Sequence, residues 1–489
     1  MNRMTLHPEF ALRPLGLLTT AVMAALLVGC ADMASIGPKA ALRDAASFQL
    51  PAAELDAITL DSHWWTAFGD AQLDRLVDKA LQGNPSLRVA QARLARARAV
   101  VDVTASAGKP QLNAAIDLTR QQLSENYIYP SPLGGSIQNF GNLQLNGSWE
   151  LDFFGKNRIA LEAAVGAAHA AAADADAARV LLASNVARGY LQWARLNAQL
   201  AVAERTLAQR DETLRLVRDR VSAGLDTRLE LRQSEGGLPE ARQQIEALRE
   251  QIALAQHALD ALVSEPNVTQ SLVPPAQAAI KNIALQPVLR ADLLGRRADI
   301  VAARWRVEAA TQDVAEARTQ FYPDINLVAF AGVQSIGLDQ LFKRGSAQWG
   351  VGPAIRLPIF EGGKLRANLR GKSADLDAAI ESYNATVLDA VRDVADQISS
   401  TQSIARQQQE QGIAQGAAES AYDIALQRYR AGLGNYLNVL TAESSVLSQR
   451  RQGVDLVARA LDAQVGLARA LGGGWKPELS AAASPATTN

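Results

Sequence analysis

Residues 143–153 read Leu-Gln-Leu-Asn-Gly-Ser-Trp-Glu-Leu-Asp-Phe, and the 66 residues from 156 to 221 that follow contain no proline. In the first stretch apolar residues or glycine occupy the odd positions and polar residues the even ones, which is the period of a β-strand with one apolar face. In the second, apolar residues recur at steps of three and four, as in a coiled-coil helix. At about 1.5 Å per residue this helix would reach about 100 Å. A strand followed at once by so long a helix decides the fold.

The same patterns occur twice along the chain, in the same order. Residues 84–113 align without a gap with residues 297–326, and Leu-Asp-Phe-Phe at 151–154 matches Leu-Pro-Ile-Phe at 357–360. A second proline-free segment spans 363–430. The sequence therefore predicts two copies of one structural unit.

The expected boundaries follow from these patterns. We expect a signal peptide (1–29), an N-terminal segment (30–62), a first repeat (63–263), a linker (264–296), a second repeat (297–472) and a C-terminal tail (473–489). After an initial helix, each repeat has two strands, a long helix and a second helix. In the first repeat these are 110–123, 142–154, 156–221 and 227–263, and in the second they are 323–334, 348–360, 363–430 and 436–472. Each helix pair forms a hairpin whose tip is Ala-Gly-Leu.

The four predicted strands have about ten residues each and one apolar face, which fits a transmembrane β-barrel with lipid outside and water inside. A four-stranded sheet in a soluble protein is the alternative. Four strands cannot close a barrel, and an open sheet in lipid leaves edge N–H and C=O groups unpaired. A chain that spans the membrane in this way must therefore oligomerise, and two, three or four copies would give 8, 12 or 16 strands.

The N-terminus has the features of a secretory signal. Arg3 and Arg13 precede an apolar stretch, 15–28, that is too short to span a bilayer as a helix. It ends in Leu27-Val-Gly-Cys30, and Cys30 is the one cysteine of the chain. This ending resembles the lipobox of bacterial lipoproteins, in which cleavage precedes the cysteine and its sulfur receives a diacylglycerol. An ordinary signal peptide with a chance cysteine is the alternative. We expect lipid attachment at Cys30.

The composition excludes several classes of protein. One cysteine and four histidines provide neither a disulfide framework nor a Cys/His metal cluster at a recognised spacing. Lys and Arg number 49 against 50 Asp and Glu, with no long run of either sign, so the sequence lacks the electrostatic footprint of nucleic-acid binding. No catalytic triad spacing and no phosphate loop is present. We expect no enzyme, no cofactor, no metal and no nucleic-acid partner.

Six motifs in order resemble the TolC-like outer membrane factors, and especially their lipoprotein branch of efflux channels (NodT-type). The motifs are Trp64-Trp65-Thr-Ala-Phe68, Asn84-Pro-Ser-Leu87, Arg297-Ala-Asp-Ile-Val-Ala-Ala-Arg304-Trp305, Leu357-Pro-Ile-Phe360, Tyr429-Arg-Ala-Gly432 and Ala470-Leu-Gly-Gly-Gly-Trp475. The resemblance implies a mixed α and β membrane protein: a trimeric 12-strand transmembrane β-barrel with four strands per chain, continued by a long periplasmic α-helical coiled-coil barrel, with an equatorial mixed domain. Residues 30–62, 264–296 and the tail would contribute to this equatorial domain.

The resemblance also implies passive conduction. The homotrimer would be the exit duct of a tripartite efflux system, accepting drugs or other small toxic compounds from an inner membrane pump, of the resistance-nodulation-division (RND) or major-facilitator (MFS) type, through a periplasmic membrane-fusion adaptor. It would lie in the outer membrane, lipid-anchored, and extend into the periplasm. An exit duct for type I protein secretion and a non-conducting lipoprotein coiled-coil scaffold are the alternatives.

Two sets of site residues follow from the resemblance. The adaptor-docking tips are Gly224, Leu225, Gly432 and Leu433, where glycine also has a local reason to end a helix. The gate candidates are Glu230 and Tyr429, at positions that correspond to a polar link between hairpins, and Asn438 and Thr441, at positions that carry a ring of carboxylates in relatives. An uncharged ring is expected to bind cations less strongly.

One motif has no counterpart in the other repeat. Gly236-Gly-Leu-Pro239 interrupts the helix expected at 227–263. Proline removes a backbone hydrogen bond and is expected to kink the helix near its tip. We favour a break that is tolerated over one that has a function.

Overall fold

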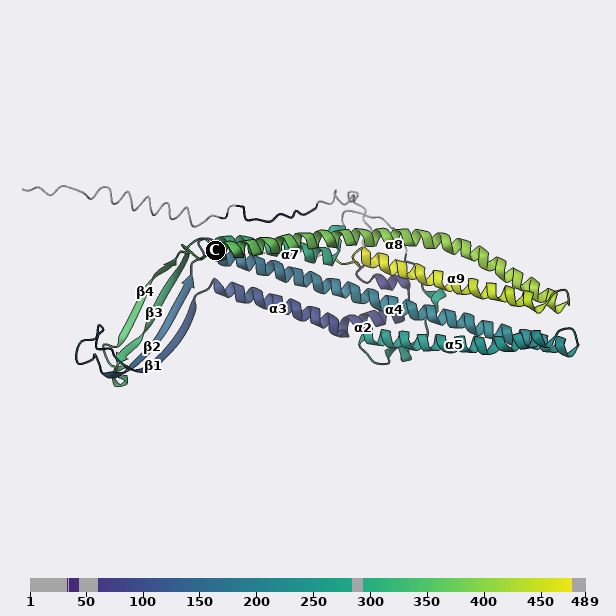
Figure 1. Cartoon of the computed structure of the whole chain (residues 1–489), viewed down its shortest axis with the longest axis horizontal. Coiled ribbons are helices and arrows are strands. Elements are labelled where there is room, and N and C mark those ends of the chain that lie inside the picture. The colour runs from purple at the N-terminus through teal and green to yellow at the C-terminus, as the bar shows by residue number, and fades with distance from the viewer. Residues whose placement is uncertain (1–32, 34, 44–59, 284–292, 477–489) are drawn as a thin grey trace, which may run out of the picture. The chain divides into compact units, whose positions relative to one another are not determined.

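The computed structural model describes residues 33, 35–43, 60–283 and 293–476 (Figure 1). The expected signal peptide, the expected lipid-attachment site at Cys30 and the end of the tail lie outside the described residues. The chain divides into two compact units. Unit 1 comprises Met1–Leu42, Ala95–Ala170 and Arg304–Ser382, and unit 2 comprises Arg43–Leu94, Ala171–Ala303 and Tyr383–Asn489.

The order of elements occurs twice, after a 3₁₀ turn at Trp64–Phe68 and helix α2 at Ala71–Gly83. The first series is α3 (Pro85–Ala107), β1 (Gln111–Gln122), β2 (Ile137–Glu150), α4 (Lys156–Ser222) and α5 (Arg228–Val263). A short helix, α6 (Leu293–Arg296), precedes the second series. This series is α7 (Ala298–Thr319), β3 (Asp324–Ile336), β4 (Ala347–Arg356), α8 (Lys364–Arg430) and α9 (Tyr436–Ala470).

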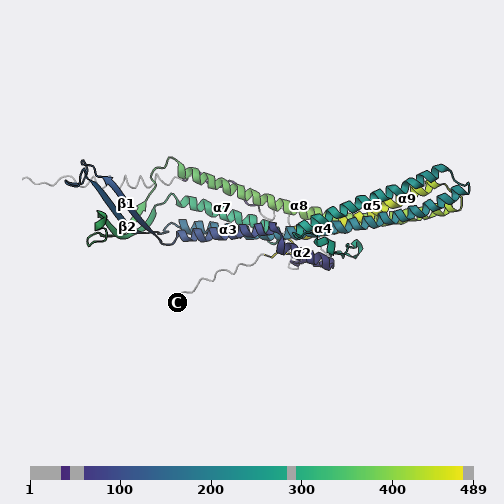
Figure 2. The same ribbon diagram turned by 90° about the horizontal axis from the view of Figure 1, so that it is seen from below.

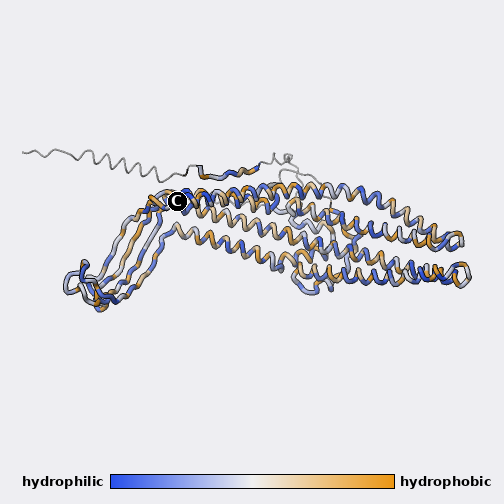
Figure 3. The backbone as a smooth tube through the Cα atoms, viewed as in Figure 1, coloured by the Kyte–Doolittle hydropathy of each residue, from blue (hydrophilic) through white to orange (hydrophobic). Residues whose placement is uncertain are grey.

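The two long helices match the proline-free segments closely: α4 and α8 each have 67 residues. Figures 1 and 2 show α4 beside α5 and α8 beside α9, as two antiparallel hairpins. Apolar and polar residues are mixed along every helix (Figure 3). Among the described residues, no helix combines the length and the apolar character that crossing a membrane requires.

Two strands differ from the predicted bounds. The sequence placed the end of the last strand at 360, but β4 ends at Arg356, because Arg356 pairs with Asp324, the first residue of β3, and β3 does not extend beyond it. The second strand spans Ile137–Glu150 rather than 142–154. Three polar residues and a glycine among positions 138–142 resemble a loop in sequence, yet Gln138 and Asn139 pair with β1.

The four strands form one antiparallel sheet in the order β1-β2-β3-β4. Its register places Leu145 beside Ala114 on one side and beside Ala331 on the other, and Ala331 beside Trp349. One face is therefore apolar across all four strands. Its large exposed residues include Leu112, Ile116, Leu118, Leu145, Trp149, Trp349, Val351 and Ile355.

The opposite face of the sheet is mostly polar. Gln144 donates to Asn146, and Gln348 donates to both Asn142 and Gln144. Val328 and Phe330 of β3 also lie on this face, so apolar and polar residues alternate less regularly along β3 than along the other strands. The sheet thus has one face suited to an apolar medium and one suited to water.

The largest apolar cluster lies in unit 2 and is built on the Trp-Trp-Thr-Ala-Phe motif. Trp64, Trp65 and Phe68 are buried with Val186, Tyr190 and Trp193 of α4 and with Leu461 and Val465 of α9. Tyr190 donates a hydrogen bond of 2.6 Å to Asp70, the N-cap residue of α2. The cluster fixes α4 and α9 side by side at this level.

Candidate functional site at the hairpin tips

The two hairpin tips have the same backbone geometry. Gly224 and Gly432 have φ values of +71° and +75°, the left-handed conformation that ends a helix. The N–H of Leu225 donates to the Arg220 carbonyl at 2.9 Å, and the N–H of Leu433 donates to the Arg428 carbonyl at 2.8 Å. The turn leaves Leu225 and Leu433 65% and 70% exposed. Each tip therefore presents one leucine to solvent.

The helices that follow the tips begin with side-chain caps. Thr227 and Glu230 form a capping box at the start of α5, in which the Glu230 carboxylate accepts from the Thr227 N–H at 2.9 Å. At the start of α9 the Asn435 side chain accepts from the Asn438 N–H at 3.0 Å. The Glu230 carboxylate is thus hydrogen-bonded at the N-terminus of its own helix.

Three residues tie the two hairpins together near their tips. The Arg220 guanidinium binds the Asp226 carboxylate at 2.8 Å and donates to the Tyr429 carbonyl at 3.0 Å. The Tyr429 hydroxyl donates to Asp226 at 2.5 Å, and Arg220 lies 4.6 Å from the centre of the Tyr429 ring. We call Arg220, Asp226 and Tyr429 the tip lock. It joins the α4–α5 turn to the end of α8.

The electrostatics of the tip lock keep each group in its bonded state. The hydrogen bond from Arg220 lowers the pKa of Asp226 below its usual value, against the effect of burial. Burial, followed by the hydrogen bond to Asp226, raises the pKa of Tyr429 above its usual value. Tyr429 is fully buried, so it stays protonated and can donate at neutral pH.

The gate residues expected from the sequence are only partly brought together. Tyr429 does contact the other hairpin, but its bonded partner is Asp226 and not Glu230. Asp226 lies in the turn, four residues before Glu230, so sequence position pointed to the carboxylate inside the helix rather than the one just before it. Sequence spacing alone carries no signal for this choice.

Asn438 and Thr441 lie on an exposed face of α9. The Thr441 hydroxyl donates to the Leu437 carbonyl at 2.9 Å. The next exposed positions along α9 are also uncharged: Ser444, Ser445, Ser448 and Gln452. The charged side chains of this part of α9 have partners on other helices: Glu443 binds Arg210 of α4, Arg450 binds Glu419 of α8, and Arg451 donates to Gln244 of α5. The exposed face of α9 next to the tip therefore carries no charge.

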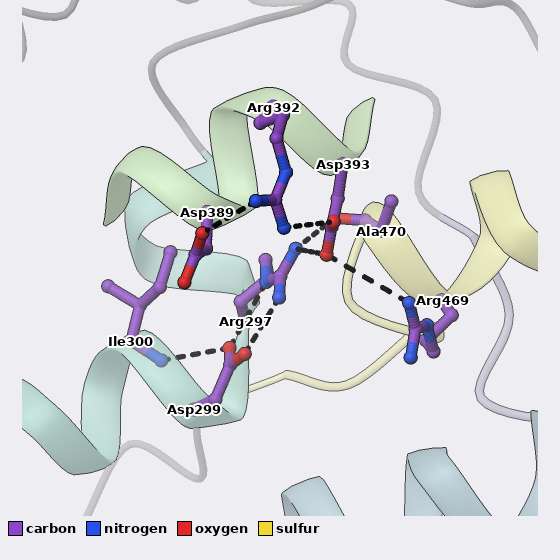
Figure 4. Close-up of polar contacts among 8 residues, drawn as sticks. All are labelled: Arg297, Asp299, Ile300, Asp389, Arg392, Asp393, Arg469 and Ala470. Carbon is purple, nitrogen blue, oxygen red and sulfur yellow. Dashed lines mark hydrogen bonds and ion pairs between the residues drawn. The ribbon is translucent and has the colours of Figure 1, made fainter. Parts of the chain in front are cut away.

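A second polar node lies at the far end of α9, around Arg297 (Figure 4). Arg297 binds Asp299 with two hydrogen bonds, of 2.7 and 3.1 Å, and lies 3.8 Å from Asp393. It also donates to the Ala470 carbonyl at 3.3 Å, and Arg469 lies 3.9 Å from Asp393. Burial would raise the pKa of Asp299, but the bonds and charge of Arg297 outweigh it and hold the pKa below its usual value. The node joins the start of α7 and the end of α9 to the middle of α8.

The chain after α9 closes against distant segments. Gly472, Gly473 and Gly474 have φ values of +95°, +60° and +72°. A Cβ at Gly472 would overlap the carbonyl of Arg296, and one at Gly474 would overlap the carbonyl of Asp61. Trp475 donates to Asp176 on α4 at 2.9 Å. We call residues 470–475 the C-terminal clasp, and only glycine fits its turn.

Within the described parts of the chain, no group of three or more His, Cys, Asp or Glu side chains could hold a metal ion. The tips, the tip lock and the Arg297 node offer polar contacts between helices and exposed leucines. They offer no nucleophile with an adjacent base.

Long helical hairpins, together with a four-stranded sheet of which one face is apolar, define the architecture of an outer membrane channel subunit. The chain belongs to the outer membrane efflux protein family, whose model matches residues 76–265 and 289–473. This confirms the family and the outer membrane location that the sequence motifs predicted.

Individual relatives agree with this assignment over nearly their whole length. Multidrug resistance outer membrane protein MdtQ of Escherichia coli O6:H1 is 33% identical over 499 residues, which cover 97% of this chain and all of MdtQ. The crystal structure of outer membrane protein VceC of Vibrio cholerae aligns with a TM-score of 0.80 and 37% identity, over 84% of this chain and 98% of VceC. The open state of the Neisseria gonorrhoeae MtrE outer membrane channel aligns with a TM-score of 0.78 and 27% identity, over 90% of this chain and 98% of MtrE.

Proposed function

We propose that three copies of this chain form the exit duct of a tripartite efflux system and passively conduct drugs or other small toxic compounds out of the cell. The observation that carries the proposal is the sheet. One face of it is apolar and exposed in all four strands, and in the described part of the chain β1 pairs only with β2 and β4 only with β3. Three such sheets joined edge to edge would make a closed 12-strand barrel with its apolar face toward lipid.

The remaining features of the duct extend this proposal. The two series of elements would be two structural repeats, 63–263 and 297–472, whose long hairpins build a helical barrel in the periplasm. Residues 30–62, the linker 264–296 and the C-terminal tail would form an equatorial domain. Diacylglycerol on Cys30 would anchor the chain in the outer membrane, with further acyl chains making the attachment durable.

The tips are the proposed docking points for a periplasmic membrane-fusion adaptor. Leu225 and Leu433 are exposed apolar side chains on rigid turns, which suit them to insert between the helices of another protein. Beyond the adaptor, an inner membrane pump of the RND or MFS type would select the substrate. The name of MdtQ refers to multidrug resistance, and this supports drugs as the cargo.

The tip lock would hold the duct closed at rest, because it ties α8 to the α4–α5 turn. The uncharged face that contains Asn438 and Thr441 would line the passage, so we expect little block by cations. A protein-secretion duct would use the same tube, and the names of the relatives favour efflux over it. A coiled-coil scaffold is disfavoured because a spacer needs no sheet with an apolar face.

Conductance in planar lipid bilayers tests the proposed function. Purified protein should insert and give discrete single-channel steps, small at rest and larger when Asp226→Ala removes the tip lock. The matched control is Asp219→Ala, which removes a carboxylate of α4 outside the tip lock. A protein that inserts but conducts no ions, with or without the tip lock, would contradict the proposal.

A further inference from the structure

Helix α5 contains the Gly-Gly-Leu-Pro motif, 236–239, that was expected to interrupt it. Pro239 lies inside α5, yet the helix continues from Arg228 to Val263. Because proline has no N–H, the Glu235 carbonyl lacks its helical donor at this point. A Cβ on Gly236 would meet nothing within 4 Å, so close packing does not explain that glycine. The other hairpin has Ser444 to Leu447 at the corresponding place in the sequence.

The side chain that lies on this motif is Arg210 of α4. Its guanidinium donates to the Gly237 carbonyl at 2.9 Å and to the Glu240 carboxylate at 2.9 Å. A Cβ on Gly237 would lie 3.5 Å from Arg210 Cδ, which is ordinary van der Waals contact. The guanidinium thus lies directly against the α5 backbone at Gly237.

Arg210 also reaches a third helix. Its Nε lies 2.6 Å from the Glu443 carboxylate on α9. One guanidinium thus joins α4, α5 and α9, which uses the planar fork of donors that lysine lacks.

The two ion pairs of Arg210 differ in their surroundings. The side chains of Arg210 and Glu443 are 15% and 8% exposed, whereas that of Glu240 is 70% exposed. An exposed pair contributes little, but a buried pair that loses one partner leaves an uncompensated charge in a dry site. The bond between Arg210 and Glu443 is therefore the one that is costly to break.

This bond lies at a separate level from the tip lock. Arg210 precedes Arg220 by ten residues along α4, which corresponds to about 15 Å. Between the two levels, Tyr422, Tyr436 and Val439 form an apolar cluster with Val217. α9 is thus bound to the α4–α5 hairpin farther from the tips than the level at which Tyr429 binds α8 to that hairpin.

We propose that Arg210 and Glu443 form a second lock of the closed duct, here called the arm lock, and that the Gly237 carbonyl and the Glu240 carboxylate keep Arg210 on the α4–α5 hairpin. The inference rests on the proposed function. When the α8–α9 hairpin moves away from α4 to open the passage, the bond to Glu443 breaks, while the bonds to Gly237 and Glu240 persist. Arg210 is a positioning residue and does not contact the cargo.

The arm lock makes a prediction that a merely structural ion pair does not. Arg210→Met leaves the buried Glu443 without its partner, and Glu443→Met leaves Arg210 with only its exposed partner, Glu240. Each variant should raise the open probability of bilayer channels by about tenfold or more. The double variant removes both charges and keeps apolar volume, so its open probability should return to within about threefold of the wild type. A structural role alone would lower the yield of trimers and leave the open probability of assembled channels unchanged.

Two controls on α5 separate the buried contact from charge in general. Glu240→Gln removes the exposed partner of Arg210 and should change the open probability by less than about threefold. Glu246→Gln removes an exposed carboxylate that pairs with Arg249 instead, and should change nothing. If the Met variants fail to assemble, Arg210→Lys decides: it keeps the charge beside Glu443 but cannot hold all three partners, so opening should rise by a smaller factor.

The failure of this inference is distinguishable from failure of the proposed function. If Asp226→Ala channels open and assembled Glu443→Met and Arg210→Lys channels stay as closed as the wild type, the arm lock is wrong and the duct stands. Additive effects in the double variant would also overturn the arm lock. If no variant conducts, including Asp226→Ala, the proposed duct itself is wrong.

Discussion

The hydroxyl of Tyr429 donates a 2.5 Å hydrogen bond to the carboxylate of Asp226, across 203 residues of sequence. Tyr429 lies in the last turn of α8, and Asp226 lies in the turn between α4 and α5. The bond therefore joins the two hairpins of the chain within a few residues of their tips. Since Arg220 binds the same carboxylate, Asp226 is held from both sides.

Tyr429→Phe tests this bond while keeping the aromatic ring. A hydrogen bond to a charged group contributes about 1.5–3 kcal/mol, so the closed tip should lose stability in this range and bilayer channels should open more often. Outer membrane trimers should be unchanged in amount, because the ring still fills its apolar cluster. Tyr422→Phe, in the same cluster but outside the tip lock, is the matched control. Equal conductance of Tyr429→Phe and wild type would show that the bond does not hold the tip.

The tip lock should also depend on acid pH. Because the folded pKa of Asp226 is lowered, its contribution to closure is present above the ordinary carboxyl pKa, near 4, and is lost as pH falls through the lower, folded value. Conductance should be flat from pH 5 to pH 8 and rise only below about pH 4. Tyr429 adds no change in this range, since its pKa is raised. Asp226→Asn channels should lack the acid rise, and an acid rise that persists in that variant would assign it to other groups.

The exposed leucines at the tips should matter for partner docking rather than for assembly. Leu433→Asp places a charge at the proposed contact and should impair drug efflux in cells severely, while the amount of outer membrane trimer stays the same. Leu433→Met keeps an apolar side chain of similar volume and should retain efflux. Accumulation of a fluorescent efflux substrate measures both. Normal efflux by Leu433→Asp would remove this tip from the docking surface.

The backbone of the tip can be tested apart from its side chains. Gly432→Val forces a β-branched residue into the left-handed conformation and should impair efflux more than trimer formation, because the turn that presents Leu433 is distorted. Gly432→Asn is the matched control, since asparagine tolerates this conformation. Loss of trimers in Gly432→Val, at unchanged synthesis, would show that Gly432 is needed for folding instead.

Substitution in the C-terminal clasp should impair trimer formation rather than efflux alone. Gly474→Ala should abolish outer membrane trimers, because its Cβ would overlap the carbonyl of Asp61. Gly363→Ala has a similar φ of +85° but open space around the Cβ, so it carries the conformational cost of about 1–2 kcal/mol without the overlap. Trimers of Gly363→Ala should persist. If both variants assemble equally well, the clasp is less tightly packed than its geometry indicates.

The proposed lipid attachment at Cys30 can be tested separately. Cys30→Ala should remove labelling by radioactive fatty acid and leave the fold intact. Labelling that persists in this variant would contradict the lipobox assignment.

Much of the architecture could be predicted from local patterns. The proline-free runs fixed the long helices to within a residue or two, and alternation located the strands, because both signals depend on neighbours in sequence. The start of β2 was not predicted, because Gln138 and Asn139 resemble a loop. Alternation was also weak where Phe330 lies on the polar face.

The polar locks were harder to foresee. Asp226 and Tyr429, or Arg210 and Glu443, meet only after both hairpins have formed, so no spacing in the sequence marks them as partners. The Gly-Gly-Leu-Pro motif was visible in sequence, but the hydrogen bond from Arg210 to the Gly237 carbonyl joins two helices across 27 residues. Composition and periodicity predict the long helices and the strands, whereas the pairing of charged residues distant in sequence is visible only in the folded structure.

The most direct test of the account is the mass of the mature protein extracted from outer membranes in detergent, measured by light scattering with the detergent subtracted. We expect three chains per particle, because three four-stranded sheets close a 12-strand barrel. A monomer that persists on dilution would contradict it, since a single sheet would then have to lie in the membrane with both edges open.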